Sequence, residues 1–268
     1  MAIDLQGRSL VITGGGTGIG AATAIAAADA GLSVCICGRR PEPLETIVEK
    51  IRGAGGQAIA VTNDVTAPGS EIELLDAAEQ AFGPTWAVFA NAGRGLDRTG
   101  HETTDNEMKE IFEVNFFATH RLMAEAASRM VAHGQGGHLL ACASCLSRFA
   151  IPRHAAYSAT KASQDILCQA MRLELKPMGI HVSSVHPITT TTEFFDVTAT
   201  VSGREESRAL EETPRFFLQS SEQVAEAIIR CLRRPRPEVW TSRIVRLVTV
   251  ARSLFPRLLD RRLRDIDR

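Results

Sequence analysis

The stretch VITGGGTGIGAA, residues 11–22, joins a short apolar run to a helical pattern near the start of the chain. Glycines let a backbone turn approach a ligand closely, and the N-terminus of the helix that follows offers unpaired N–H groups with partial positive charge. A flexible turn without a ligand has the same composition, but a strand before it and a helix after it favour a dinucleotide pyrophosphate site. One spacing, G-x-G-x-x-A, starts at Gly16; we prefer T-G-x-x-x-G-x-G, which starts at Thr13, nearer the strand end.

Short apolar runs alternate with amphipathic stretches along most of the chain. Strands are predicted at 9–13, 33–37, 57–61, 86–90, 137–143, 180–185 and 238–242, and helices near 18–30, 41–53, 70–81, 104–131, 155–176 and 221–232. Short buried strands that alternate with helices are typical of βαβ units. We therefore predict an α/β fold with a single-domain, doubly wound (Rossmann-like) parallel β-sheet and helices on both faces.

The predicted domain covers residues 1–242 and contains one long irregular segment. Residues 189–220 are polar and poorly periodic, and they follow a strand whose carboxyl end lies where ligands bind in such folds. We predict that this segment is a mobile substrate lid. Residues 243–268 form a separate tail.

Composition excludes some classes of function. The 268 residues carry a formal net charge of −1, which gives no argument for nucleic acid as a partner. We expect neither an export signal nor a membrane-spanning helix, and therefore a cytoplasmic protein. Six cysteines are present, and we predict no disulfide framework. Cys142 and Cys145 have C-x-x-C spacing, but their place in a predicted strand favours small buried residues over redox or metal chemistry.

The end of the second predicted strand indicates which dinucleotide binds. An NAD site usually has a carboxylate there, which accepts hydrogen bonds from the ribose 2′-hydroxyl. This chain instead has Gly38, Arg39 and Arg40, and a guanidinium binds a 2′-phosphate that a carboxylate would repel. The arginines could also be solvated loop residues. We predict NADP(H) as the cofactor, with Arg39 the first candidate for the phosphate and Arg40 the second.

A tyrosine and a lysine, Tyr157 and Lys161, lie four residues apart in a predicted helix and therefore share a face. A free tyrosine has a pKa of about 10, and bringing it to about 7 requires roughly 4 kcal/mol of preference for the phenolate. A unit charge about 4 Å away at an effective dielectric constant near 20 supplies about that much. The alternative is a core tyrosine beside a lysine that reaches solvent. The chain has no other tyrosine, and the glycine loop favours an acid/base pair.

Several motifs occur in a fixed order. They are T-G-x-x-x-G-x-G at 13–20, N-D-V at 63–65, A-N-A-G at 90–93, Asn115, Ser144 and Y-x-x-x-K at Tyr157 and Lys161. In this order they resemble the short-chain dehydrogenase/reductase family over roughly residues 7–240, with Ala90 in place of the first asparagine of N-N-A-G. The resemblance implies an oxidoreductase that transfers a hydride between NADP(H) and a carbonyl or secondary alcohol.

The resemblance also implies catalytic roles for Asn115, Ser144, Tyr157 and Lys161. Ser144 would position the substrate oxygen, and Tyr157 would give it a proton in reduction or take one in oxidation. Lys161 would lower the pKa of the tyrosine and hold the nicotinamide ribose, and Asn115 would fix a water that links Lys161 to solvent. A strand-end cap and a polar mid-helix residue are the alternatives for Ser144 and Asn115.

The cofactor residues that the resemblance implies follow the same motifs. They are Gly14, Gly16, Thr17, Gly18, Ile19 and Gly20 in the loop; Arg39 and Arg40; Asp64 and Val65 at the adenine; Asn91, Ala92 and Gly93; Tyr157 and Lys161; and Pro187, Ile188, Thr190 and Thr192. The family usually has glycine where this chain has Ile188. A β-branched residue is poorly suited to positive φ, so we expect ordinary or shifted backbone there. Thr192 is the preferred contact to the nicotinamide carboxamide, and Thr190 is the substitute.

Apolar residues flank the catalytic positions and begin the predicted lid. Candidates for the substrate pocket are Ser144, Leu146, Phe149, Ile151, His154, Tyr157, Phe194 and Phe195. They favour an apolar or mixed alcohol or ketone, although ordinary packing explains each of them as well. His154 is expected at the pocket rim or the surface. No metal site is predicted.

The tail has a basic amphipathic pattern. Apolar residues at helical spacing are Ile244, Leu247, Val248, Ala251, Leu254, Phe255, Leu258 and Leu259, with arginines on the other face and a kink or restart expected at Pro256. We favour packing or dimerisation through this helix, and the alternative is contact with an anionic membrane surface. A homodimer is expected.

Two rival functions use the same scaffold. One is a protein that binds or senses NADP(H) without catalysis, for which an acid/base tyrosine would be unnecessary. The other is an NAD-dependent enzyme of the same family, in which Arg39→Asp would not impair binding. Neither the substrate nor the physiological direction follows from the fold.

Overall fold

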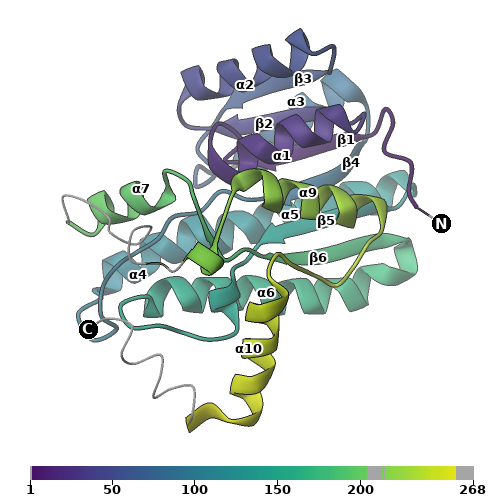
Figure 1. Ribbon diagram of the computed structural model, residues 1–268. Coiled ribbons are helices and arrows are strands. Elements are labelled where there is room, and N and C mark those ends of the chain that lie inside the picture. Colours follow the sequence, from purple (N-terminus) through teal and green to yellow (C-terminus); the bar gives the residue numbers. More distant parts are fainter. Residues whose placement is uncertain (1, 204–212, 214, 258–268) are drawn as a thin grey trace.

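The structure is a computed structural model and describes residues 2–203, 213 and 215–257. Seven parallel strands form one sheet in the order β3-β2-β1-β4-β5-β6-β9 (Figure 1). Their bounds are β1 Ser9–Thr13, β2 Ser33–Gly38, β3 Ala58–Thr62, β4 Thr85–Ala90, β5 Gly137–Cys142, β6 Ile180–His186 and β9 Glu238–Trp240. The doubly wound parallel sheet predicted from the sequence is confirmed, and every predicted strand is present.

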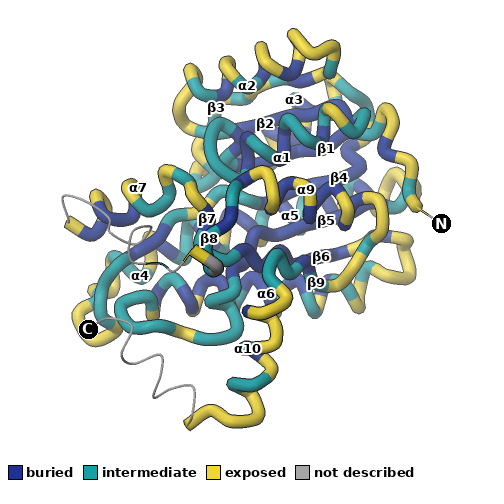
Figure 2. The backbone as a smooth tube through the Cα atoms, viewed as in Figure 1, coloured by how far each residue is buried: buried dark blue, intermediate teal, exposed yellow. Residues whose placement is uncertain are grey.

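Helices cover both faces of the sheet, as the alternating pattern predicted. One core cluster joins the sheet to α1 (Gly18–Asp29), α2 (Pro41–Gly53) and α9 (Ser221–Arg233). The other joins it to α3 (Ser70–Phe82), α5 (Ala118–His133) and α6 (Ala155–Leu175). Figure 2 shows the buried strands between these two layers. The order in which strands are added to the sheet reverses between β1 and β4, and ligands bind in such folds at the carboxyl ends of those strands.

The predicted helix over 104–131 is not continuous. It consists of α4 (Asp105–Phe112), a π-helical segment at Glu113–Phe117, and α5. A Thr104–Glu107 capping box fixes the start of α4. Single π-turns inside longer helices are often found at functional sites. The period of the sequence did not show this interruption, because one extra residue barely disturbs the apolar pattern.

The segment predicted as a lid contains regular structure. Thr189–Thr190 (β7) pairs in parallel with Leu218–Gln219 (β8), and Phe194–Val201 forms the short helix α7. The polar composition predicted neither element. Residues 204–212 and 214 lie outside the described residues, and the mobile lid at 189–220 stays a prediction.

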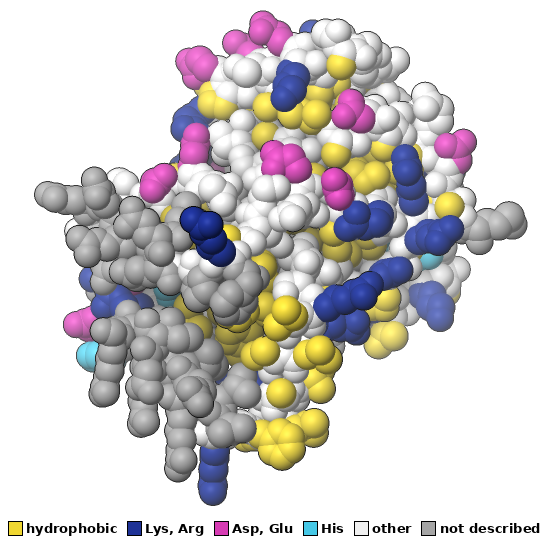
Figure 3. All heavy atoms as spheres, viewed as in Figure 1, with side chains coloured by type: hydrophobic (Ala, Val, Ile, Leu, Met, Phe, Trp, Pro, Cys, Tyr) yellow, Lys and Arg dark blue, Asp and Glu magenta, His cyan; other side chains and the backbone are white. Residues whose placement is uncertain are grey.

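The tail begins with α10 (Arg243–Leu254), which projects from one end of the molecule (Figure 1). The helix ends before Pro256, as the sequence predicted. Apolar side chains are visible over this helix in Figure 3. Leu258 and Leu259 lie outside the described residues. Among the helices that the structure describes, none has the length and hydrophobicity that crossing a bilayer requires.

Candidate active site

The turns after β1 and β4 are bonded to each other at the carboxyl edge of the sheet. The Thr13 hydroxyl oxygen accepts hydrogen bonds from the backbone N–H groups of Asn91 and Ala92, both at 2.9 Å. The Asn91 side-chain amide donates in turn to the carbonyl oxygens of Thr13 at 2.9 Å and Gly14 at 3.3 Å. Two predicted cofactor segments, 13–20 and 90–93, therefore form one unit, with Asn91 as the brace.

The glycine loop has the features that a pyrophosphate requires. The N-cap of α1, Thr17, makes no side-chain cap bond, and the first turn holds no acidic residue. The first N–H groups of a helix lack intrahelical acceptors and bind anions. A Cβ at Gly20 would lie 2.1 Å from the carbonyl oxygen of Gly14, so only glycine fits there. Gly18 has a φ of +53°, and a Cβ on it would meet the Thr192 side chain at 3.0 Å. Thr192 therefore lies over the loop.

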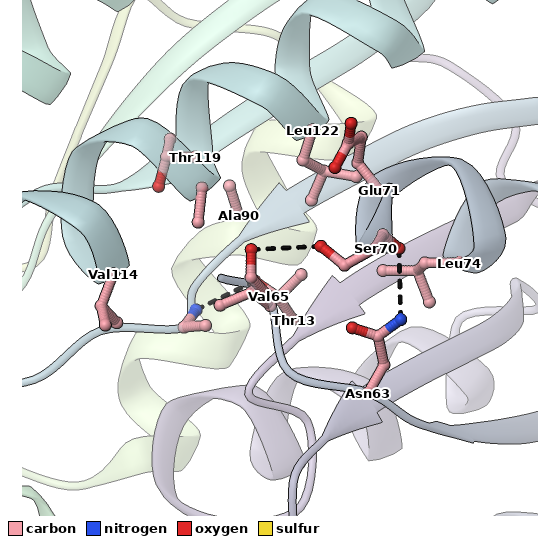
Figure 4. Close-up of a pocket in the computed structure, with 12 residues that line it drawn as sticks. Thr13, Asn63, Val65, Ser70, Glu71, Leu74, Ala90, Val114, Thr119 and Leu122 are labelled. Carbon is pink, nitrogen blue, oxygen red and sulfur yellow. Dashed lines mark hydrogen bonds between the residues drawn. The ribbon is translucent and has the colours of Figure 1, made fainter. Parts of the chain in front are cut away.

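A narrow cavity opens beside the loop, between the ends of the first strands and the start of α5 (Figure 4). Val65 and Ala92 line it together with Asn63. The Ser70 hydroxyl donates to the carbonyl oxygen of Val65 at 3.1 Å and holds that turn in place. This is where the sequence predicted the adenine.

Asp64, the other predicted adenine contact, accepts hydrogen bonds from its own turn. The backbone N–H and the hydroxyl of Thr66 donate to its carboxylate at 2.9 and 2.8 Å. These bonds, and to a smaller extent the positive charge of Arg39, hold the pKa of Asp64 below its ordinary value. The carboxylate therefore stays charged and orders the loop after β3.

The two arginines after β2 have different neighbours. Arg39 is exposed, and its positive charge lowers the pKa of Asp64. Arg40 donates from Nη2 to Glu193 Oε2 at 2.8 Å, with the two side chains 60% and 55% exposed. Glu193 directly precedes α7, and the sequence analysis did not single it out. The pair joins the turn after β2 to the start of α7.

Ser144, Tyr157 and Lys161 come together across the ends of β5 and α6. Ser144 caps the short turn Cys145–Ser147, its hydroxyl oxygen accepting from the N–H of Leu146 at 3.1 Å. The Ser144 side chain also lies near enough to the hydroxyl of Tyr157 to lower the pKa of that phenol. Lys161 Nζ donates to the carbonyl oxygen of Cys142 at 2.7 Å and lies 5.6 Å from the centre of the Tyr157 ring. Ser144 is thus both a cap and a partner of the tyrosine.

Burial controls the protonation of this group. It raises the pKa of Tyr157 well above its ordinary value, and the Ser144 side chain offsets only part of the rise. Burial also lowers the pKa of Lys161. In this structure burial outweighs the effect of Lys161, which is itself buried and bonds to a carbonyl group, so Tyr157 is a neutral phenol. The lower tyrosine pKa, which was expected from Lys161 together with the positive nicotinamide of an oxidised cofactor, stays a prediction.

Asn115 lies in the π-helical segment and is fully buried. Its side-chain oxygen accepts from the N–H of Arg94 at 2.8 Å, and its side-chain amide donates to the carbonyl oxygen of Arg94 at 2.9 Å and the hydroxyl of Thr160 at 3.0 Å. A Cβ on Gly93 would lie 3.2 Å from Asn115 Oδ1 and 3.4 Å from Lys161 Nζ. The predicted residues Gly93, Asn115 and Lys161 therefore meet in one place.

The backbone oxygen of Asn115 already has donors that the sequence analysis missed. The Gln164 side-chain amide and the Thr119 hydroxyl both donate to it. Gln164 lies on α6 and is fully buried, and its own side-chain oxygen has no hydrogen-bond partner within the described structure. The water predicted at Asn115 stays a prediction. Position on the buried face of α6 was the signal that could have identified Gln164.

The stretch after β6 has ordinary backbone. Arg153 is the one described non-glycine residue with positive φ, so Ile188 takes the place of glycine without that conformation, as expected. The carbonyl oxygen of Pro187 accepts from the N–H of Cys145 at 3.0 Å, which ties this stretch to the Ser144 turn. The Thr190 hydroxyl donates to the carbonyl oxygen of Ile188 and accepts from Gln219. Thr192, over the glycine loop, is therefore better placed to contact a cofactor than Thr190.

Phe194 is the predicted pocket residue that the structure places at the catalytic tyrosine. Its ring centre lies 5.7 Å from that of Tyr157, and a Cβ on Gly95 would meet its ring at 3.1 Å. Phe195 packs on Phe194, with ring centres 5.5 Å apart. The other candidates lie along the segment between Ser144 and α6, all half-buried: Leu146, Phe149, Ile151 and His154. The His154 ring bonds to the carbonyl oxygen of Pro152 at 3.0 Å, which fits a rim residue.

A buried polar network lies behind Ser144, and the sequence analysis did not predict it. His186 Nδ1 is 3.1 Å from the carbonyl oxygen of Ser144, and its ring is stacked on Trp240 at 4.4 Å. Asp165 accepts from the hydroxyl of Ser184 at 2.8 Å and pairs with Arg148 at 2.8 Å. Burial lowers the pKa of His186, so a neutral ring supports the serine turn.

Cysteines and metal-ligating groups form no second centre. All six thiols are free; Cys142 is buried at the end of β5, whereas Cys145 is half-buried and begins the following turn. In the part of the chain that the structure describes, no three His, Cys, Asp or Glu side chains are grouped as metal ligands.

Comparisons with known proteins identify the family. The family described as short chain dehydrogenase matches residues 8–201. An uncharacterized oxidoreductase of Mycobacterium tuberculosis is 32% identical over 84% of this chain and 85% of its own. An L-rhamnose 1-dehydrogenase (NAD(P)(+)) of Sphingomonas is 32% identical over 70% of this chain and 75% of its own.

A solved structure extends the agreement to the fold. The short chain dehydrogenase/reductase from Burkholderia phymatum in complex with NAD superposes with a TM-score of 0.87, covering 96% of each chain at 24% identity. The glycine loop, the tyrosine–serine–lysine group and the matched sequence lead to the same conclusion. The chain belongs to the short chain dehydrogenase family of oxidoreductases.

Proposed function

We propose that the protein is an NADP(H)-dependent oxidoreductase that interconverts an apolar ketone or aldehyde and the corresponding alcohol. The observation that carries this proposal is the grouping of three side chains: Ser144 caps the turn after β5, and Lys161 bonds to the carbonyl oxygen of Cys142 and lies 5.6 Å from the centre of the Tyr157 ring. A non-catalytic nucleotide sensor has no use for a neutral phenol held at that place.

The residues fit a bound dinucleotide, which when present exchanges a hydride with the carbon that bears the substrate oxygen. Tyr157 holds the proton at its hydroxyl and passes it to that oxygen during reduction. The Ser144 hydroxyl donates a second hydrogen bond to the same oxygen and orients it. Phe194 packs against the tyrosine ring and excludes water from that side. Lys161, beside Gly93 and Asn115, faces the ribose side of the groove.

The choice of NADP(H) rests on the turn after β2. Arg39 is exposed near Asp64. Strand β2, Ser33–Gly38, contains no acidic residue, and the two residues that follow it are Arg39 and Arg40. A planar guanidinium binds a 2′-phosphate through two hydrogen bonds. An NAD-dependent enzyme is the second candidate, because one relative's name reads NAD(P)(+) and one similar structure contains NAD.

A cytoplasmic homodimer is part of the proposal. Six free thiols suit a reducing compartment. Exposed apolar side chains on the outer faces of α5 and α6, Val131, Ile166 and Leu173, offer a surface for a second copy. Sedimentation velocity on the purified protein tests the dimer.

Titration with NADPH and NADH, followed by NADPH consumption across a panel of apolar ketones and aldehydes, tests the proposal. We expect tighter binding of NADPH, turnover with at least one panel member, and loss of that turnover in Tyr157→Phe. Turnover that survives in Tyr157→Phe would refute the assigned proton donor, and tighter binding of NADH would refute the cofactor assignment.

A further inference from the structure

Helix α10 packs on the rest of the protein through Val245 and Thr249, which are not part of the apolar stripe predicted from the sequence. Val245 and Thr249 are buried, whereas the stripe expected to pack is turned outward. Ile244, Leu247 and Leu254 in that stripe are 59%, 69% and 68% exposed. Val248 and Ala251 of the same stripe are half-buried, so the stripe packs on its own domain along one edge only.

Exposed apolar side chains continue along the stripe. Val250, beside the stripe, is 54% exposed, and Phe255, directly after the helix, is 62% exposed. Single exposed apolar residues are common, but a contiguous group at helical spacing marks a surface that binds something apolar. Figures 2 and 3 show the exposed edge of α10 and the apolar side chains on it.

The same segment is strongly basic. Residues 241–257 contain four arginines, at 243, 246, 252 and 257, and no acidic residue. The whole tail, 243–268, has eight arginines and three aspartates, a net charge of +5, whereas the chain as a whole carries −1. Residues 1–242 therefore carry a net charge of −6, so positive charge is concentrated beside the apolar stripe.

An anionic lipid surface can bind both the exposed apolar side chains and the arginines of α10. Apolar side chains enter the boundary between headgroups and acyl chains, and arginines beside them meet the headgroup charge. A second copy packed on this stripe would bring arginine against arginine. We propose that α10 binds the surface of an anionic membrane and lies in its plane, with Ile244, Leu247 and Leu254 immersed.

The position of α10 brings the active site to that membrane. The helix starts directly after β9, where Trp240 stacks on His186, and His186 contacts the carbonyl oxygen of Ser144. A membrane-bound α10 would thus hold the Ser144 turn, at the catalytic edge of the sheet, near the lipid surface. This last point rests on the proposed function, but binding to vesicles does not.

Co-sedimentation of the full-length protein with vesicles tests the proposal. We expect binding to vesicles of equal parts phosphatidylglycerol and phosphatidylcholine, weaker binding in high salt, and none to phosphatidylcholine alone. Arg243→Gln/Arg246→Gln should lower the partition coefficient roughly 30-fold, because each basic residue near an anionic surface contributes about fivefold. Ile244→Gln/Leu247→Gln/Leu254→Gln should lower it at least about tenfold.

Matched variants away from α10 serve as controls. Arg233→Gln/Arg234→Gln removes the same charge from the turn after α9, and Ile72→Gln changes an apolar residue on α3 that is 45% exposed. Both should bind vesicles like wild type, and all variants should keep their NADPH affinity, which shows that they are folded. Equal binding by wild type and both α10 variants, or no binding to anionic vesicles, would overturn the proposal. The proposal would also be overturned if the wild-type protein did not bind vesicles and formed a dimer that dissociated in Ile244→Gln/Leu247→Gln/Leu254→Gln.

Discussion

The ion pair between Arg40 and Glu193 makes a quantitative prediction about cofactor choice. If Arg40 binds the 2′-phosphate of NADPH, its ion pair with Glu193 must break. The free energy of the ion pair then weakens the binding of NADPH by the same amount. Its atoms are 2.8 Å apart, and both side chains are more than half exposed. Such pairs contribute about 0.2–1 kcal/mol. Glu193→Gln removes that cost, so the Kd for NADPH should fall about 1.4- to 5-fold.

NADH is the internal control, because it has a 2′-hydroxyl in place of the 2′-phosphate and therefore does not compete with Glu193 for Arg40. Its Kd should stay within about 1.4-fold of wild type in Glu193→Gln. The assay is titration calorimetry with each nucleotide at constant ionic strength. In the Arg40→Gln background, Glu193→Gln should have no effect on NADPH, since the competition is already gone.

Two results would refute this reasoning. If Glu193→Gln weakened both nucleotides equally, the pair would be a clasp that holds the start of α7 over the groove. If NADPH affinity were unchanged in Glu193→Gln and in Arg40→Gln alike, Arg40 would have no part in binding the phosphate, and Arg39 would be the remaining candidate.

The remaining predictions concern the catalytic group and the glycine loop. Tyr157→Phe should lower kcat by about 10²- to 10⁴-fold with an unchanged Kd for NADPH; an unchanged kcat would show that another group supplies the proton. Because burial raises the pKa of Tyr157, its neutral form stabilises the fold below the unfolded pKa of about 10, and this contribution is lost at higher pH; urea midpoints above about pH 10 should fall further for wild type than for Tyr157→Phe. Gly20→Ala should abolish nucleotide binding, whereas Gly53→Ala, whose Cβ meets nothing within 4 Å, should bind normally in the same titration. Gln164→Leu should lower the free energy of unfolding by about 1–3 kcal/mol, because the Asn115 carbonyl loses a buried donor; an unchanged urea midpoint would count against that role.

Periodicity and glycine spacing were enough to predict the sheet and the placement of its catalytic edge. The central strands β1, β4 and β5 are fully buried, and the predicted bounds of all seven strands agree with the structure to within about two residues. The predicted group of Ser144, Tyr157 and Lys161 also came together, because strand ends and helix faces are fixed by the same alternation. These features depend on local patterns, which a single sequence carries.

Features that depend on contacts between distant segments were not predictable in the same way. Glu193 lies 153 residues from Arg40, and nothing local to either residue indicates the pair. The burial of Tyr157 and Lys161, which raises the tyrosine pKa and lowers the lysine pKa, could not be seen in the sequence. The apolar stripe of α10 was found, but a periodic pattern cannot tell which face of a helix meets the protein.

The π-helical segment at Glu113–Phe117 has a consequence for how this enzyme tolerates change in its gene. A π-turn is an α-helix that holds one residue too many, so losing one residue there would restore regular helix and leave the hydrophobic pattern nearly intact. The helix before the deletion would, however, rotate by about 100° relative to the helix after it. Asn115 would leave its partners although no catalytic residue had been substituted. At this place the geometry around Asn115 depends on the length of the chain as much as on its chemistry.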